Sequence, residues 1–168
     1  FDDLIARTAA LLEQPGIAEW IRYKLDQRID HILVDEAQDT NAAQWRIVRT
    51  LAEEFFSGAG AKGDKVRTVF TVGDFKQAIF GFQGTSPQNF AAAQLLFQRD
   101  AMDAGHDFHS LSLDRSFRST PAVLDVVDRT IATLCAERLG LEAGEVHHDS
   151  ANRHPGEVIL WKPVIAKL

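Results

Sequence analysis

The sequence predicts an α/β fold with a mostly parallel sheet and flanking helices. Short apolar runs rich in Ile and Val alternate along the chain with longer stretches whose apolar residues recur at helical spacing. The two clearest apolar runs, at 29–34 and 66–72, both stop abruptly at acidic residues. Because parallel strands need a long crossover between them, this alternation of strand and helix favours a parallel sheet.

Five helices are predicted between and around these runs, at about 1–12, 17–25, 41–56, 87–104 and 121–140. Pro15-Gly16 ends the first helix, Thr40 or Asn41 caps the third, and Pro87 suits the first turn of the fourth. The remaining segments are two shorter strands, at 108–113 and 158–161, and two loops, at 57–65 and 142–156.

Composition limits the classes of protein to which the chain can belong. Its 45% hydrophobic and 25% charged content is ordinary for a globular protein, and no apolar run approaches the length of a membrane span. The net charge of −6 argues against a protein that binds nucleic acid non-specifically over its whole surface. It is compatible with DNA binding along one localised path. A single cysteine, Cys135, excludes an internal disulfide framework, which agrees with a cytoplasmic protein. The chain begins on Phe1, and we expect it to be a piece of something longer.

The stretch Ile32-Leu33-Val34-Asp35-Glu36-Ala37-Gln38-Asp39-Thr40 places two adjacent carboxylates where a buried strand is predicted to end. Ligands of open α/β sheets gather at the carboxyl ends of the strands. One of the two carboxylates, Asp35 or Glu36, can hold Mg²⁺, because this ion prefers hard oxygen ligands. Its neighbour can orient and deprotonate an attacking water. The alternative is a strand that simply ends in a solvated acidic turn.

A second acidic strand end lies in Val72-Gly73-Asp74-Phe75-Lys76-Gln77-Ala78-Ile79-Phe80-Gly81-Phe82-Gln83-Gly84. The amide of Gln77 can sense a γ-phosphate by hydrogen bonding. Phe80 and Phe82, set among glycines, can stack on unpaired bases, an interaction worth about 1–3 kcal/mol per base. The alternative is that both phenylalanines pack into the core.

The third informative stretch, Leu113-Asp114-Arg115-Ser116-Phe117-Arg118-Ser119-Thr120-Pro121, sets two arginines beside an aromatic ring. Arg118 can contact a transferring phosphate, and Phe117 can stack on a nucleobase. The alternative is an arginine that caps a helix, with Phe117 in the core.

The glycine-rich segment 57–65 does not match a phosphate-binding loop. Gly58 and Gly63 have the required separation, but Asp64 occupies the lysine position and Lys65 the hydroxyl position. The segment also follows a helix rather than a strand. We interpret it as a surface turn, so the sequence supplies no phosphate cradle.

Taken in order, the three stretches resemble motifs of the UvrD/Rep-type superfamily 1 DNA helicases. The first is similar to the Walker B sequence Asp-Glu-x-Gln-Asp, the second to motif III, and the third to motif IV. Phe1-Asp2-Asp3-Leu4 resembles the segment that leads back into the first motor domain of this family. The lysine at position 76 and the sequence of residues 154–158 resemble the corresponding positions of the AddA/RecB branch of this family. That branch comprises the helicase-nuclease subunits of double-strand break repair. Gln83 and Ser116 depart from the family, whose members often carry arginine and asparagine there.

The resemblance implies a partial RecA-like P-loop NTPase fold. Residues 1–107 would be the C-terminal part of the first RecA-like motor domain, and 108–168 the start of the second. The implied function is that of an AddA-like ATP-dependent DNA helicase, which couples ATP hydrolysis to translocation along single-stranded DNA and to unwinding. The implied cofactors are ATP and Mg²⁺. The implied partners are single-stranded and double-stranded DNA and a second, AddB-like subunit.

The resemblance also implies roles for the side chains around the nucleotide. Asp35 would hold the Mg²⁺ of MgATP, and Glu36 would be the catalytic base for the attacking water. Phe117 would stack on adenine, and Arg118 would neutralise γ-phosphate charge in the transition state.

Four further side chains would link the nucleotide to DNA. Gln38 and Gln77 would couple the γ-phosphate to the DNA track, while Phe80 and Phe82 would meet single-stranded bases. Because the phosphate cradle is missing, we expect this segment to be inactive in isolation.

Three alternatives remain open from the sequence. The chain can derive from a UvrD/Rep-type helicase without a nuclease, or from a degenerate, non-catalytic scaffold domain. A free-standing metal hydrolase would combine the acidic pair with the histidines of the polar tail, His147, His148 and His154.

Overall fold

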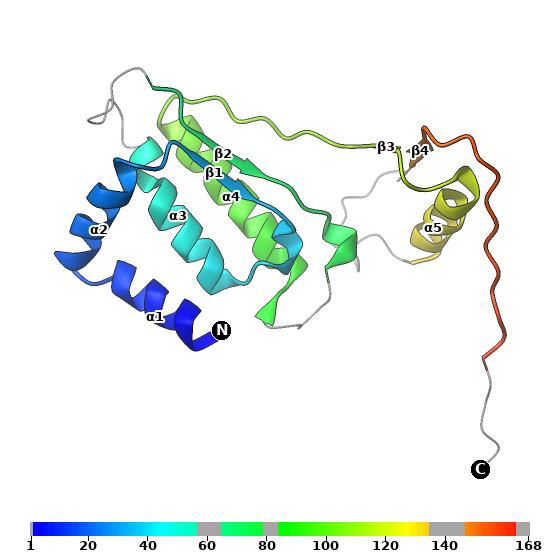
Figure 1. Cartoon of the computed structure of the whole chain (residues 1–168), viewed down its shortest axis with the longest axis horizontal. Helices are drawn as coiled ribbons and strands as arrows, with labels where there is room; N and C mark the ends of the chain where they lie inside the picture. The colour runs from blue at the N-terminus through cyan, green and yellow to red at the C-terminus, as the bar shows by residue number, and fades with distance from the viewer. Residues whose placement is uncertain (1, 57–64, 79–83, 135–146, 164–168) are drawn as a thin grey trace, which may run out of the picture. The chain divides into compact units, whose positions relative to one another are not determined.

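The chain divides between His109 and Ser110 into two units, which are described separately. The computed structural model describes residues 2–56, 65–78, 84–134 and 147–163. Small parallel sheets with flanking helices confirm the predicted α/β fold class (Figure 1). No helix in these described ranges is long and apolar enough to traverse a bilayer.

Two parallel strands, β1 (His31–Val34) and β2 (Thr68–Thr71), form the sheet of the first unit. His31 pairs with Thr68 and Val34 with Thr71, so the strands end level at one edge. The pairing continues beyond them, because the Val72 amide donates to the Val34 carbonyl at 2.8 Å. This register brings the two acidic turns side by side.

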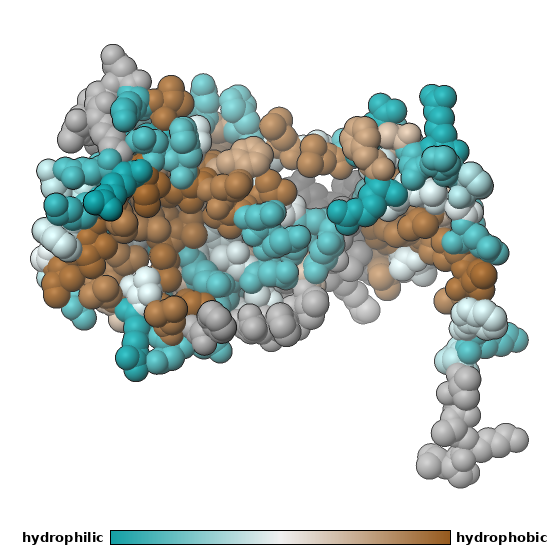
Figure 2. Space-filling view, in the orientation of Figure 1, coloured by the Kyte–Doolittle hydropathy of each residue, from teal (hydrophilic) through white to brown (hydrophobic). Residues whose placement is uncertain are grey.

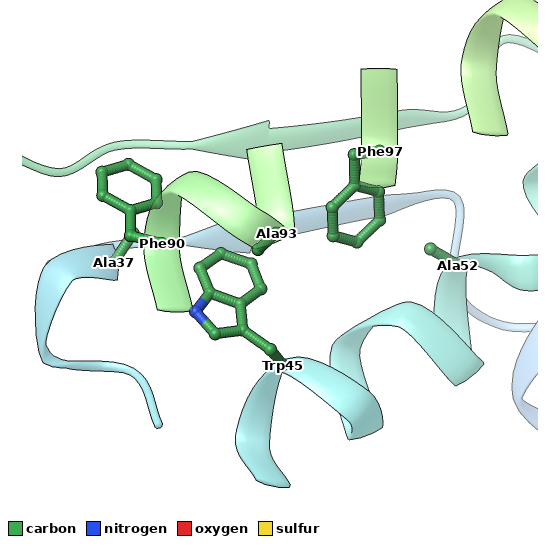
Figure 3. Packing of buried hydrophobic residues seen from close by; sticks show 6 residues of the cluster. All are labelled: Ala37, Trp45, Ala52, Phe90, Ala93 and Phe97. Carbon is green, nitrogen blue, oxygen red and sulfur yellow. The ribbon is translucent and has the colours of Figure 1, made fainter. Parts of the chain in front are cut away.

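Helices α3 (Ala42–Phe56) and α4 (Pro87–Asp103) pack on one face of this sheet. Trp45 on α3 stacks on Phe90 of α4 with ring centroids 6.1 Å apart, and it meets the edge of Phe97 at 6.2 Å. The buried cluster comprises Ala37, Trp45, Ala52, Phe90, Ala93 and Phe97 (Figure 3). Because Ala37 belongs to this cluster, the turn after β1 rests directly on the core.

The other face of β1 and β2 remains open to solvent. Leu33 is 69% exposed and Phe70 is 57% exposed, and apolar side chains gather over this part of the first unit (Figure 2). The prediction of a fully buried strand is therefore wrong for this chain, since α3 and α4 both pack on the opposite face. Each strand instead alternates between exposed and half-buried residues.

Helix ends follow local signals in the sequence. The Asn41 side chain accepts hydrogen bonds from the amides of Ala43 and Gln44, both at 3.0 Å, and Gln44 Oε1 accepts from the Asn41 amide at 2.8 Å. This reciprocal arrangement is a capping box, so Asn41 rather than Thr40 caps α3. Helix α4 closes on Gly105, whose φ of 72° suits a glycine.

Helices α1 (Asp2–Leu12) and α2 (Ile17–Asp26) pack against α3 and confirm the first two predicted helices. The buried residues of these two helices are Ala9, Leu12 and Ala18, of which only Leu12 has a large side chain. Ile17 and Trp20, which the helical spacing places on one apolar face, are both largely exposed.

Arg67 joins the start of β2 to the ends of α2 and α3. Its Nη2 lies 2.6 Å from Asp26 Oδ1, and the two groups form an ion pair whose geometry is not that of a hydrogen bond. The side chain of Arg67 is only 10% exposed and that of Asp26 only 12%. The guanidinium also lies 5.0 Å from the centre of the Phe55 ring, and its Nη1 donates to the Glu54 carbonyl at 3.2 Å. Breaking such a pair is costly, because the remaining charge keeps its desolvation penalty.

Replacement of Arg67 by methionine should therefore lower the free energy of unfolding by about 3 kcal/mol. The matched control is Arg7→Met, which removes an ion pair to Asp3 whose side chains are 78% and 77% exposed. That control should cost less than about 0.5 kcal/mol. Urea denaturation measures both values, and equal costs would contradict the structural role of Arg67.

The second unit consists of α5 (Pro121–Thr133) and a short parallel pair, β3 (Arg115–Ser116) with β4 (Asp149–Ser150). Helix α5 ends at Thr133, because Leu134 is extended, so the predicted end near residue 140 is wrong. The segment around Cys135 lies outside the described residues.

The predicted strands at 108–113 and 158–161 do not form. Phe108 packs against the core of the first unit instead, and the apolar residues Leu111 and Leu113 are exposed. Residues 158–161 also lie in solvent, Leu160 and Trp161 most of all. Apolar composition alone predicts a strand in both places, but neither segment is hydrogen-bonded into a ladder in the described structure.

Asp128 on α5 holds the segment that leads into β4. Its Oδ2 accepts the His148 amide at 3.1 Å, its Oδ1 contacts Nδ1 of the same histidine, and His147 Nδ1 lies 3.5 Å from Oδ2. Burial alone would raise the pKa of the Asp128 carboxyl. The hydrogen bonds from His148 and the nearby histidines outweigh burial and hold this pKa below its ordinary value of 3.8.

Because its folded-state pKa is lowered, Asp128 stabilises the second unit above pH 3.8, and this contribution is lost as the pH falls through the folded-state pKa. Asp128→Asn should therefore destabilise the protein by about 1 kcal/mol at neutral pH, with the difference from wild type vanishing at strongly acid pH. Thermal melts of both proteins over a pH series measure this difference. A penalty that stays constant with pH would contradict the assignment.

Candidate functional site

The turn after β1 presents Asp35 and Glu36 at the carboxyl end of the strand, where the sequence predicts them. Both side chains are exposed. Glu36 has a φ of 50°, and among the described residues it alone is a non-glycine residue with positive φ. Such a conformation costs of order 1–3 kcal/mol and needs support from its surroundings. The Glu36 amide donates to Asp35 Oδ1 at 2.9 Å, and the Ala37 amide donates to the Val72 carbonyl at 2.9 Å.

Gln38 connects this turn to the turn after β2. It lies in the short 3-10 helix η1 (Ala37–Asp39) and is 2% exposed. Its Nε2 donates to Glu36 Oε2 at 2.7 Å, and its Oε1 accepts the Asp74 amide at 3.0 Å. Because a backbone amide can only donate, Oε1 must face Asp74, and Nε2 must then face Glu36. We refer to this pair of hydrogen bonds as the Gln38 bridge.

The turn after β2 reaches the bridge because Gly73 has no side chain. A Cβ at this position would lie 2.9 Å from Gln38 Oε1 and 2.9 Å from Phe90 Cε1. Phe75 then stacks on Phe90 with ring centroids 4.4 Å apart, which anchors the turn to the start of α4. The role of Phe75 could not be predicted from the sequence, because an aromatic residue in a turn carries no periodic signal.

Gln77 extends the hydrogen-bonded chain to solvent. It lies at the end of the 3-10 helix η2 (Phe75–Gln77), is exposed, and donates from Nε2 to Asp74 Oδ2 at 3.1 Å. Glu36, Gln38, Asp74 and Gln77 are therefore linked in one series across the edge of the sheet. The predicted DNA-contacting residues Phe80 and Phe82 lie outside the described residues.

The second unit carries the other two predicted site residues. Phe117 is 79% exposed, and the Arg115 guanidinium lies 6.0 Å from the centre of its ring. The alternative of Phe117 as a core residue is therefore wrong. Arg118 is also exposed, and its carbonyl accepts from Asn152 Nδ2 at 3.4 Å.

The acidic pair suits a hard cation that is only partly held by protein. Within the described ranges, no group of three or more His, Cys, Asp or Glu side chains can hold a metal ion. Asp35 and Glu36 are two exposed carboxylates at one strand end. Mg²⁺ fits such a site, because it keeps several waters and takes further oxygen ligands from bound phosphates.

Gly73→Ala should lower the free energy of unfolding by about 1–3 kcal/mol, since the added methyl group overlaps Gln38 and Phe90. In a Phe90→Leu background the same change should cost less, because one of the two close contacts is relieved. Thermal or urea unfolding of the four proteins completes this double-mutant cycle. A Gly73→Ala variant as stable as wild type would contradict the close approach of the two turns.

Comparison with known proteins gives consistent matches. Residues 1–98 match the family described as UvrD/REP helicase N-terminal domain. The ATP-dependent DNA helicase UvrD1 of Mycobacterium tuberculosis is 34% identical over 139 residues, which cover 82% of this chain and 16% of the relative. UvrD1 of Mycobacterium leprae is 34% identical over 166 residues, which cover 92% of this chain and 19% of that relative. The ATP-dependent DNA helicase PcrA of Staphylococcus aureus is 33% identical over 132 residues, which cover 78% of this chain and 15% of that relative. The chain thus spans less than a fifth of each of these relatives.

Proposed function

The chain belongs to the UvrD/REP helicase family, and from this membership we propose that it is part of an ATP-dependent DNA helicase of the UvrD/PcrA type. The observation that carries the proposal is the pair of adjacent strand ends, with Asp35 and Glu36 exposed on one and Gln77 on the other. We assign residues 1–107 to the first RecA-like motor domain and 108–168 to the start of the second. The division of the chain between His109 and Ser110 supports this assignment.

In the proposed site, Asp35 holds the Mg²⁺ of MgATP, and Glu36 orients and deprotonates the attacking water. Bound Mg²⁺ would supply neutralisation of phosphate charge. Gln77 reaches the γ-phosphate from the second turn. The exposure of all three side chains supports these roles.

The roles proposed for the second unit are stacking of Phe117 on adenine and charge neutralisation by Arg118. The exposed Phe117 ring offers the flat apolar surface that stacking needs. Arg118 offers a guanidinium suited to phosphate oxygens. Phe80 and Phe82 remain our candidates for contact with single-stranded bases.

A helicase-nuclease of the AddA type, with an AddB-like partner subunit, is a second candidate. Lys76 and the segment 154–158 favour it. The relatives given above are named as DNA helicases, and those names support the nuclease-free reading instead. Mg²⁺-dependent cleavage of linear DNA by the complete polypeptide would select the second candidate, and unwinding without cleavage would select the first.

The direct test is Glu36→Gln in the complete polypeptide. ATP hydrolysis stimulated by single-stranded DNA should fall at least about 100-fold in kcat, because the base is lost, while binding of MgATP persists. Glu13→Gln is the matched control, because it makes the same chemical change on an exposed carboxylate outside the proposed site. Glu13 forms an exposed ion pair with Arg46 of α3. A Glu36→Gln variant with wild-type kcat would contradict the catalytic role. A wild-type protein without DNA-stimulated hydrolysis would contradict the proposed function itself.

A further inference from the structure

We propose that Gln38 is a positioning residue that sets the Glu36 carboxylate and the turn after β2 in one arrangement without touching the nucleotide. The inference rests on the proposed function, because it assigns Gln38 a part in the same hydrolytic site. It differs from the role implied by the family resemblance, in which Gln38 binds the nucleotide cofactor and couples its γ-phosphate to the DNA track.

The Gln38 amide is held by groups of the protein itself. Gln38 is 2% exposed, and both ends of its amide already have partners inside the protein. A direct contact with a phosphate would have to use the second N–H of Nε2, on a residue that is only 2% exposed. The Oε1 end is crowded as well, because a Cβ built on Gly73 would meet Gln38 Oε1, Phe90 and Ala37 within 3.0 Å. The amide is therefore built to hold protein groups.

The carboxylate of Glu36, the proposed base, takes its position from Gln38. Glu36 sits in a left-handed backbone conformation, and its side chain is exposed, so packing does little to select one rotamer. The 2.7 Å bond from Gln38 Nε2 to Glu36 Oε2 selects one. A base held in one position activates water more effectively than one that samples several, because productive geometry is already in place.

The other end of the Gln38 bridge holds the turn after β2. Gln38 Oε1 holds the Asp74 amide, and Asp74 Oδ2 accepts from Gln77 Nε2. A displacement of Gln38 therefore disturbs Glu36 and the turn that carries Gln77 at the same time. Gln38 thus couples the Glu36 carboxylate to the turn that carries Gln77, in addition to the backbone bonds that join Val72 to Val34 and Ala37.

Two substitutions separate the ends of the bridge. Gln38→Met has nearly the same shape and removes both hydrogen bonds. Gln38→Glu keeps an acceptor for the Asp74 amide and, at a pH alkaline enough to ionise it, replaces the donor to Glu36 by a second carboxylate. In the complete polypeptide, both variants should lower kcat for DNA-stimulated ATP hydrolysis at least about 10-fold, with KM for ATP within about twofold of wild type.

The matched control is Gln44→Glu, which makes the same change on a nearby glutamine whose Oε1 caps α3 and can be replaced by a carboxylate. It should leave kcat and KM unchanged. A thermal melt of each variant separates loss of folding from loss of rate, and Gln38→Glu decides the question if Gln38→Met does not fold, because it preserves the bond to Asp74.

Two outcomes would overturn the inference while the proposed function stands. Raised KM with preserved kcat in both Gln38 variants would mean that the residue contacts the nucleotide. Wild-type kcat and KM in Gln38→Met, or in Gln38→Glu at a pH alkaline enough to ionise both carboxyls, would mean that the bridge has no role in hydrolysis. A wild-type polypeptide that does not hydrolyse ATP would instead remove the proposed function, and the inference with it.

Discussion

The parallel register of β1 and β2 brings two acidic turns within hydrogen-bond reach, and the buried amide of Gln38 joins them. The rest of the site depends on this contact. The strained backbone of Glu36 is tolerated because the amides of Glu36 and Ala37 are both hydrogen-bonded, to Asp35 Oδ1 and to the Val72 carbonyl. The Gln38 bridge also holds the Glu36 side chain. The second turn can approach because Gly73 has no side chain and Phe75 is anchored on Phe90.

The core beneath these turns explains why the edge of so small a sheet is well defined. Aromatic residues of α3 and α4 pack against one face of both strands, and Ala37 from the turn itself is fully buried among them. The start of β2 is fixed in the same way by the buried ion pair between Arg67 and Asp26. Each end of β2 is thus tied to a helix or to a buried side chain, so both strands keep one register and present their carboxyl ends together.

Local signals in the sequence predicted much of this arrangement, namely the helices, the two main strands and the acidic residues at their ends. The contacts that organise the site could not be predicted, because their partners lie far apart in the chain. Gln38 and Asp74 are separated by 36 residues, and neither carries a pattern that names the other. Composition also predicted strands at 108–113 and 158–161, where no neighbouring strand in the described structure supplies a ladder. The roles of Phe117 and Arg118 stay predictions that exposure supports.

Two turns distant in sequence form one hydrogen-bonded unit through Gln38, and amide hydrogen exchange at Asp74 tests this most directly. In the wild-type chain the Asp74 amide should exchange slowly, because it donates to the buried Gln38 Oε1. In Gln38→Met its protection should vanish, while amides in the middle of α3 keep theirs. Exchange of the wild-type Asp74 amide at the rate of an unprotected residue would contradict the Gln38 bridge.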